Sequence, residues 1–101
     1  MAGRVATVTR KTRETAIRVR IHLDGTGRTA IETGIPFLDH MLTLLGTHAG
    51  FDVGVSARGD LDVDLHHTNE DLGLVVGEAL VKALDGSRGI QRFGWAYVPM
   101  E

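Results

Sequence analysis

Three side chains able to bind a metal ion lie within residues 66–70, whose sequence is HHTNE. If a helix begins near His66, Glu70 shares a helix face with both imidazoles, because it follows them at i+4 and i+3. Adjacent histidines diverge by about 100° in a helix and point to opposite faces in a strand. The spacing of His66 and His67 therefore favours two metal ions, one for each imidazole. The alternative is a polar helix start, at which Glu70 and Asp71 are favoured by the helix dipole.

Two further histidines share the next candidate segment, in which Asp39 precedes His40 and His48 follows one helix length later. A carboxylate beside a histidine can orient the ring, as acids behind metal ligands often do. Eight residues of helix rise about 12 Å, so His40 and His48 cannot both bind one ion at roughly 2.1 Å. We expect His40 to be a ligand and His48 to bind substrate or to cap the helix terminus. Taken singly, each histidine is better explained by a structural role.

For other charged residues, the sequence gives weaker evidence of a catalytic or binding role. Glu14 lies just before a segment with a basic outer face, and from the residues alone it is a surface charge. Arg88 and Arg92 lie in a glycine-rich turn, where an arginine fork matches phosphate oxygens, although turn arginines are usually solvated. Asp62 and Asp64 alternate with apolar residues and are expected to form the solvated face of a strand.

The segments that must position these side chains begin with residues 15–23, in which apolar and polar residues alternate. A period of two predicts a strand with one covered face. Residues 5–9 are a weaker candidate for an earlier strand. The sequence DGTG at 24–27 predicts a hairpin turn, because glycine tolerates positive φ, and residues 28–33 are expected to return as the second strand.

Two helices are predicted by apolar residues at helical spacing. The first starts at Pro36, which suits the first turn of a helix, and runs to Ala49, with Gly50 as its C-terminal stop. The second is centred on residues 72–84. Thr68-x-x-Asp71 resembles its capping box, with Asp in place of the usual Glu.

The remaining segments complete the predicted sheet. Residues 51–57 and 61–65 alternate on either side of a turn at 58–60, which predicts a second hairpin. Residues 89–98 are expected to start another strand. The predicted order is ββαββα, and the fold class is α+β: a four-stranded, mainly antiparallel sheet with two helices on one face.

Composition excludes several function classes. The chain has 101 residues, which is one domain at most, and its net charge of −2 gives no general attraction to nucleic acid or anionic membranes. Cysteine is absent, so any metal must be held by imidazole and carboxylate. No apolar run approaches the roughly 20 residues of a membrane-spanning helix, and no secretory signal is recognisable. We therefore expect a cytoplasmic protein that binds neither nucleic acid nor membrane.

Several stretches of the sequence, taken in order, resemble the N-terminal half of the imidazoleglycerol-phosphate dehydratase family, enzymes of histidine biosynthesis. The resemblance covers nearly the whole chain, and DHML followed by HHTNED is its most specific part. The stretches are TRET at 12–15, LDGTG at 23–27, TGIPFLDHML at 33–42, GDLDVDLHHTNEDLG at 59–73 and GIQRFGWAYVPM at 89–100.

The resemblance implies an architecture of two similar halves, each with a four-stranded sheet and two helices. Residues 1–101 would then form a single half-domain of the ribosomal protein S5 domain 2-like type, equivalent to the first half. The resemblance also implies two manganese ions and an assembly built from trimers. Nitrogen and oxygen ligands suit manganese and allow zinc or iron in its place.

Site residues can be carried over from the family motifs position by position. Glu14 resembles the acid/base carboxylate, and Arg92 resembles an arginine that contacts substrate, most simply on phosphate. The residues that resemble metal ligands are His40, His66, His67 and Glu70. The residues that resemble substrate contacts are Glu14, His40, His48, His66, His67, Glu70 and Arg92.

The implied reaction removes water from imidazole glycerol phosphate and gives imidazole acetol phosphate. The proton that must leave the glycerol chain is not acidic. Metal coordination to a ring nitrogen favours the imidazolate form of the substrate, and the imidazolate can expel the adjacent hydroxyl. Glu14, by resemblance, then takes the neighbouring proton. The expected activity is that of a metal-dependent hydro-lyase.

The family enzyme continues through a second half with its own HHxxE motif, which this sequence lacks. The final Pro-Met-Glu also stands where the family has Pro-Met-Asp-Glu. We therefore expect an isolated, engineered or reconstructed half that borrows ligands from another copy and forms a homo-oligomer. The alternatives are a module that folds, oligomerises and binds metal without catalysis, and a small structural domain with incidental histidines.

Overall fold

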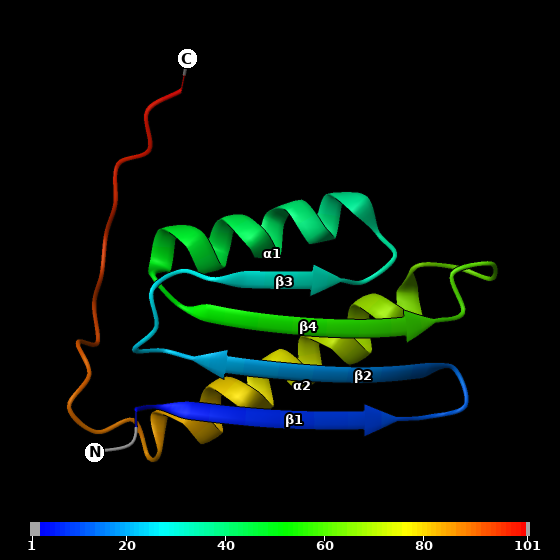
Figure 1. The fold of residues 1–101 in the computed structure, drawn as a ribbon, viewed down its shortest axis with the longest axis horizontal. Helices are drawn as coiled ribbons and strands as arrows, with labels where there is room; N and C mark the ends of the chain where they lie inside the picture. The colour runs from blue at the N-terminus through cyan, green and yellow to red at the C-terminus, as the bar shows by residue number, and fades with distance from the viewer. Residues whose placement is uncertain (1–2, 101) are drawn as a thin grey trace.

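The computed structural model describes residues 3–100 of the chain, so residues 1, 2 and 101 lie outside the described part. It has four strands and two helices (Figure 1), which confirms the α+β class, although their order is βββαβα. The elements are β1 (Val5–Lys11), β2 (Thr15–His22), β3 (Thr29–Glu32), α1 (Pro36–Ala49), β4 (Asp52–Gly59) and α2 (His66–Leu84).

The sheet has the strand order β1-β2-β4-β3. β2 pairs antiparallel with β1 and β4, whereas β3 runs parallel to β4, so the sheet is mainly antiparallel as predicted. The predicted hairpin between residues 15–23 and 28–33 is wrong, because β4 lies between these strands. The Asp52 carboxylate at the start of β4 accepts the backbone N–H groups of Thr26 and Arg28, at 3.0 and 2.9 Å. These bonds, which also lower the pKa of Asp52, hold the loop across the start of β4.

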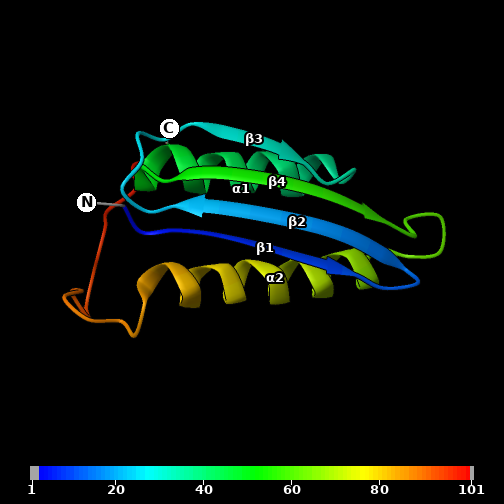
Figure 2. The same cartoon turned by 60° about the horizontal axis from the view of Figure 1, so that its bottom comes forward.

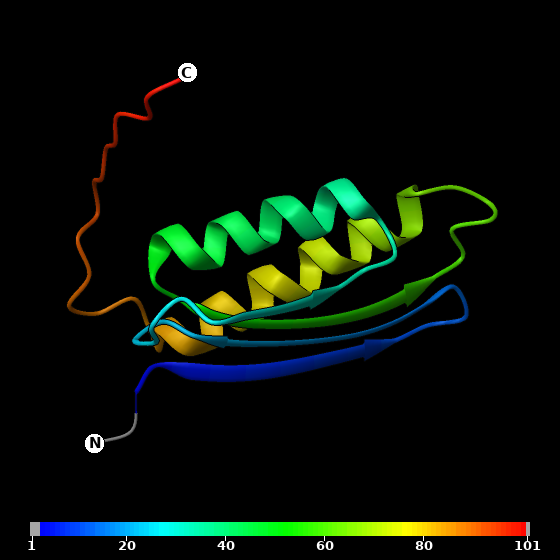
Figure 3. The same cartoon turned by 45° about the horizontal axis from the view of Figure 1, so that its top comes forward.

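The core lies between one face of the sheet and the two helices. Figures 2 and 3 show both helices on the same side of the sheet, where α2 packs on β1, β2 and β4, and α1 packs on β3 and β4. Alternate residues of β2 face the helices and are buried, which confirms the predicted strand with one covered face. The buried apolar residues of β2, β4 and α2 are Ile17, Val19, Ile21, Val53, Val55, Ala57, Leu72, Val75, Ala79 and Ala83.

Both ends of α1 were predictable. Pro36 occupies the first turn, and Gly50 adopts φ +74° as its N–H bonds to the carbonyl of Gly46. The start of α2 was not predicted correctly. The helix begins at His66, so the predicted capping box at Thr68 and Asp71 is wrong. Thr68 is fully buried inside the helix. It lies so close to Gly59 that any side chain at that glycine would overlap the Thr68 hydroxyl.

Two predicted strands are absent from the described residues. Residues 61–65 form turns, in which the N–H of Val63 bonds to the carbonyl of Asp60 at 2.9 Å. Both edges of β4 are already paired with β2 and β3, so no neighbour is available for a second hairpin there. Residues 89–98 leave the fold as an extended tail with exposed side chains (Figure 1) and pair with no strand. No helix within residues 3–100 has the length and apolar character needed to cross a membrane.

Candidate functional site

Most of the predicted acid/base and metal-binding residues lie at one end of the sheet. β1, β3 and β4 all end there, and both helices begin there (Figure 1). The β1–β2 turn carries Glu14, the residue after β4 is Asp60, and α2 opens with His66 and His67. Antiparallel pairing of β2 with its neighbours and the return through α2 therefore bring together residues that lie more than 50 positions apart.

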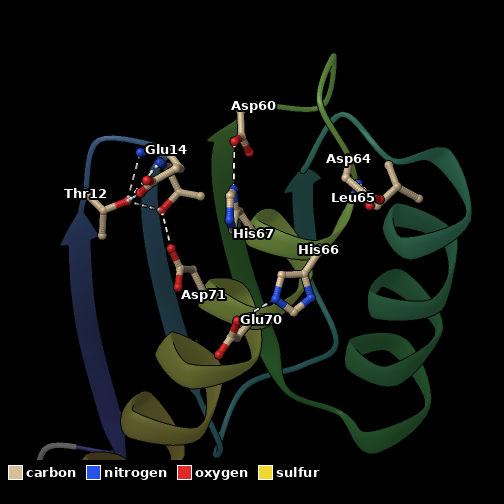
Figure 4. A network of polar contacts seen from close by, with 10 residues as sticks. Thr12, Glu14, Asp60, Asp64, Leu65, His66, His67, Glu70 and Asp71 are labelled. Atoms are coloured by element: carbon tan, nitrogen blue, oxygen red, sulfur yellow. Dashed lines mark hydrogen bonds and ion pairs between the residues drawn. The ribbon is translucent and has the colours of Figure 1, made fainter.

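His67 is oriented by Asp60, whose carboxylate lies 2.7 Å from the imidazole Nδ1 (Figure 4). The hydrogen bond to Asp60, followed by the charge of that carboxylate, raises the pKa of His67, and the charges of Glu14 and Asp71 add to the effect. When the ring is neutral, an Nδ1–H that donates to Asp60 leaves the Nε2 lone pair available. A carboxylate behind an imidazole is the usual arrangement at metal-binding histidines.

We expect Asp60→Asn to lower the pKa of His67 in metal-free protein, because the charged partner of the imidazolium is lost. The pKa is measured from the ring resonances in an NMR titration, and the parent protein under the same conditions serves as the reference. In the parent protein, protonated His67 stabilises the fold below its ordinary pKa of about 6.5. This contribution to stability is lost as the pH rises through the raised pKa of His67 in the folded protein. An unchanged His67 titration in the variant would contradict the assigned contact.

His66 faces a different partner. Its Nε2 lies 3.0 Å from an oxygen of Glu70, one helical turn later. The rings of His66 and His67 are 5.7 Å apart between centroids and tilted by 56°, which agrees with the predicted divergence of adjacent histidines. An exposed pair such as His66 and Glu70 adds little to stability. These two side chains are therefore available for chemistry.

Glu14 is held in place by the turn that carries it. The Thr12 hydroxyl lies 3.2 Å from a carboxylate oxygen of Glu14 and accepts the backbone N–H groups of Glu14 and Thr15. The Thr15 hydroxyl in turn donates to Asp71 of α2 at 2.6 Å. Arg10 lies 3.5 Å from the other oxygen of Asp71. This network fixes the β1–β2 turn against the first turns of α2.

Asp60 and Asp71 are site residues that the sequence reasoning missed in these roles. Asp71 was expected in a capping box and instead joins the helix to the turn that carries Glu14. Asp60 was expected only as a turn residue. No short-range pattern marks either contact, because Thr15 and Asp71 are 56 residues apart.

Thr15→Val is expected to destabilise the fold by about 1–3 kcal/mol, because the partly buried Asp71 carboxylate loses its hydroxyl donor. Thr15→Ser keeps the hydroxyl and is the matched control. Urea denaturation followed by circular dichroism measures both free energies of unfolding. Equal stability of the valine and serine variants would show that the hydrogen bond contributes nothing.

Within residues 3–100, no hydrogen bond or ion pair links the other predicted site residues to this group. His40 is exposed on α1, and its neighbour Asp39 does not orient it. The Asp39 carboxylate instead accepts the backbone N–H of Thr33 at 2.9 Å and the Thr33 hydroxyl, which fixes the loop before α1. His48 lies in the last turn of α1, at the opposite end of the molecule, and Arg92 lies on the exposed tail beyond α2 (Figure 1).

The imidazole and carboxylate groups at this end of the sheet are suitable ligands for a divalent metal ion, but there are too few of them to complete a site. Imidazole nitrogens and carboxylates without thiolate fit manganese, iron or zinc. Within residues 3–100, no three His, Asp or Glu side chains meet in an arrangement that could hold an ion. His66 with Glu70 and His67 backed by Asp60 are therefore two incomplete ligand sets, and manganese prefers six ligands.

A surface cleft of about 390 Å³ adjoins Glu14 and Asp60. Its rim carries the cationic side chains of Lys11, Arg13 and Arg58. None of the three forms an ion pair with another described residue. The end of the sheet thus places a carboxylate and an oriented imidazole beside unpaired positive charge, which suits a small anionic substrate.

Comparison with known proteins gives consistent matches. The family model described as imidazoleglycerol-phosphate dehydratase matches residues 33–101. The protein of that name from Desulforudis audaxviator is 60% identical over all of this chain and 52% of its own length. The one from Gloeobacter violaceus is 54% identical over all of this chain and 51% of its own length.

A solved structure extends the match to the fold. The crystal structure of imidazoleglycerol-phosphate dehydratase from Staphylococcus aureus has a TM-score of 0.76 and 32% identity to this chain. The match covers 96% of this chain and 52% of the crystallised chain. The chain therefore spans about half the length of the relatives that it matches.

Proposed function

The chain belongs to the imidazoleglycerol-phosphate dehydratase family, and we propose that assemblies of it dehydrate imidazole glycerol phosphate to imidazole acetol phosphate in histidine biosynthesis. One observation supports this above the others. Glu14, the Asp60-oriented His67 and the His66–Glu70 pair meet at one end of the sheet (Figure 4). These are residues that the family resemblance marks for acid/base and metal-ligand roles.

We propose that His40, His66, His67 and Glu70 contribute ligands to two metal ions, manganese in the first instance. A bound divalent cation would act as a Lewis acid toward the imidazole of the substrate. Asp60 would keep the Nδ1 of His67 occupied, so that Nε2 is the ligand atom. The ligands missing from one chain would come from another copy, since no complete set is present within residues 3–100.

Glu14 is the proposed acid/base group. Its carboxylate borders the cleft and is positioned by the Thr12 hydroxyl, so it can remove a proton from the glycerol chain without large rearrangement. That proton and the departing hydroxyl together make the water that is lost. The enol that remains becomes the ketone when its O–H proton is lost and a proton is added to carbon, which leaves the number of protons unchanged.

We propose that His48 and Arg92, which lie outside the group around Glu14 and His67, contact the substrate. The last turn of α1, which carries His48, and the tail after α2, which carries Arg92, lie at the end of the molecule opposite the β1–β2 turn (Figure 1), so both residues would serve the site of a neighbouring copy. Arg92 would contact the phosphate, because an arginine fork pairs two oxygens at once. Self-association is thus part of the proposed function.

The direct test is formation of imidazole acetol phosphate by the purified chain with added Mn²⁺, compared with the same protein after chelation. Metal-dependent product formation is the expected result. The incomplete ligand sets within residues 3–100 favour a second candidate, a module that folds, self-associates and binds metal without turnover. That module would bind Mn²⁺ in the same experiment and form no product.

A further inference from the structure

Two buried polar atoms near His67 have no hydrogen-bond partner among residues 3–100: the hydroxyl oxygen of Thr68 and Oδ1 of Asp60. The Thr68 side chain is fully buried in the first turns of α2. Buried polar groups in folded proteins are nearly always hydrogen-bonded, because an unpaired group loses its interaction with water and gains none in return. Both atoms therefore require a partner within the fold.

The two atoms belong to the same contact between the end of β4 and the start of α2. Oδ2 of Asp60 lies 2.7 Å from Nδ1 of His67, the residue before Thr68 (Figure 4). Gly59, the residue before Asp60, approaches α2 so closely that a Cβ there would overlap the Thr68 hydroxyl. Two contacts thus hold residues 59–60 against residues 67–68, and each of these short segments carries one of the unpaired atoms.

The two atoms are chemically complementary, since a hydroxyl can donate one hydrogen bond and an ionised carboxylate oxygen only accepts. The hydroxyl hydrogen rotates freely, and the last torsion of an aspartate side chain has broad minima, so both groups adjust at small cost. A helical threonine can instead donate to the carbonyl four residues earlier, here that of Asp64. That choice would leave Oδ1 of Asp60 unpaired, whereas a bond between Thr68 and Asp60 satisfies both atoms.

We propose that Thr68 is a positioning residue, whose hydroxyl donates to Oδ1 of Asp60 while Oδ2 of the same carboxylate accepts the Nδ1–H of His67. The carboxylate is then held at both oxygens, and Nε2 of His67 keeps its free lone pair. The use of that lone pair as a metal ligand rests on the proposed function, but the two hydrogen bonds form in the metal-free chain.

The second anchor matters because Asp60 lies in a turn and its side chain is 21% exposed. Water can therefore compete with His67 for the carboxylate. A hydrogen bond from a fully buried hydroxyl restricts the carboxylate to one orientation, and successive hydrogen bonds in a chain strengthen one another. Thr68 would thus set the orientation of His67 without touching it through its side chain.

The test is the tautomer of His67 in metal-free protein, measured from the ring ¹⁵N chemical shifts at a pH above the raised pKa of this residue, where the imidazole is neutral. The parent chain is expected to hold the Nδ1–H tautomer. Thr68→Val keeps the shape of the side chain without the hydroxyl and is expected to shift the population toward Nε2–H. Thr68→Ser keeps the hydroxyl and should retain the parent tautomer. An unchanged tautomer in Thr68→Val would overturn the proposal.

Thr33→Val is the matched control for this measurement. Thr33 is also fully buried, and its hydroxyl donates to a different carboxylate, that of Asp39. The variant is expected to lose stability and to keep the parent tautomer of His67. A shift as large as that of Thr68→Val would show that the tautomer follows any loosening of the fold, and it would equally overturn the proposal.

A double-mutant cycle with Asp60→Ala measures the same bond through urea denaturation of metal-free protein. In the parent background, Thr68→Val is expected to raise the unfolding equilibrium constant about tenfold, because a buried carboxylate oxygen loses its donor. In the Asp60→Ala background it is expected to change this constant by less than about threefold, since the acceptor is already absent. Equal losses in both backgrounds would indicate a bond to the Asp64 carbonyl instead and would contradict the assignment.

Mn²⁺ affinity connects this bond to the proposed function. Groups behind metal ligands typically contribute about 10–100-fold to affinity, so Thr68→Val is expected to weaken the binding of one Mn²⁺ per chain by that factor. The ion assigned to His66 and Glu70 should be unaffected. Unchanged affinity for both ions would remove Thr68 from its positioning role. A parent chain without turnover, in which Thr68→Val still shifts the tautomer, would count against the proposed function and not against this bond.

Discussion

Glu14→Gln is expected to lower kcat by about 10²–10⁴-fold, the range that general acid/base groups contribute. The amide keeps the size of the side chain and can still accept a hydrogen bond from Thr12. It cannot take a proton at neutral pH, so the loss falls on kcat and leaves metal content and oligomer mass unchanged. The measurement is turnover of imidazole glycerol phosphate at saturating substrate with added Mn²⁺.

Glu32→Gln is the matched control for this variant, because Glu32 is exposed in β3 and takes no part in the proposed chemistry. It changes the net charge by the same amount. If the two variants retain equal turnover, Glu14 does not move the proton, and the acid/base assignment is wrong.

Loss of metal is the expected result of removing the histidines of α2. His66 and His67 diverge, so each is proposed to serve a different ion. His66→Ala and His67→Ala are therefore each expected to release one class of bound Mn²⁺, and the double variant to release both. Removal of groups behind the ligands typically weakens binding by about 10–100-fold, and loss of a ligand itself should cost more. Metal content after dialysis is measured by inductively coupled plasma mass spectrometry.

His48→Ala is the matched control, since His48 lies in the last turn of α1 at the other end of the molecule (Figure 1). It should retain the metal content of the parent chain. If His67→Ala retained as much metal as His48→Ala, the proposed ligand assignment would fail. If both single variants lost all metal at once, the two histidines would serve one ion or two strictly coupled ions.

Local patterns in the sequence were sufficient for the parts of the fold that depend on local contacts. The alternation in residues 15–23 marked β2 and its covered face, because that strand has one side against the helices. Pro36 and Gly50 marked the ends of α1 through their own backbone preferences. The spacing of His66 and His67 also indicated that their rings would diverge.

The errors occurred where long-range contacts outweigh local pattern. Residues 61–65 alternate like a strand, but both edges of β4 are taken, so the segment turns and connects to α2. The DGTG turn at 24–27 has the composition of a hairpin, yet Asp52 holds this loop across the start of β4. Thr68 has the composition of a helix cap, yet the close approach of Gly59 buries it within the helix.

The candidate site was predictable in its residue types and only partly in its arrangement. The sequence identified His66, His67, Glu70 and Glu14, and the fold brings them to one end of the sheet. It did not identify Asp60 as the partner of His67, because that contact depends on how the turns after β4 fold back. The separation of His48 and Arg92 from the other residues also depends on the complete fold.

We propose that this chain holds two incomplete metal-ligand sets and that another copy completes them. Native mass spectrometry after reconstitution with Mn²⁺ measures oligomer mass and bound metal in the same particles. We expect oligomers that carry Mn²⁺ in proportion to the number of chains, with metal-free monomer as the dissociated form. A stable monomer that binds no metal in the presence of excess Mn²⁺ would contradict this proposal.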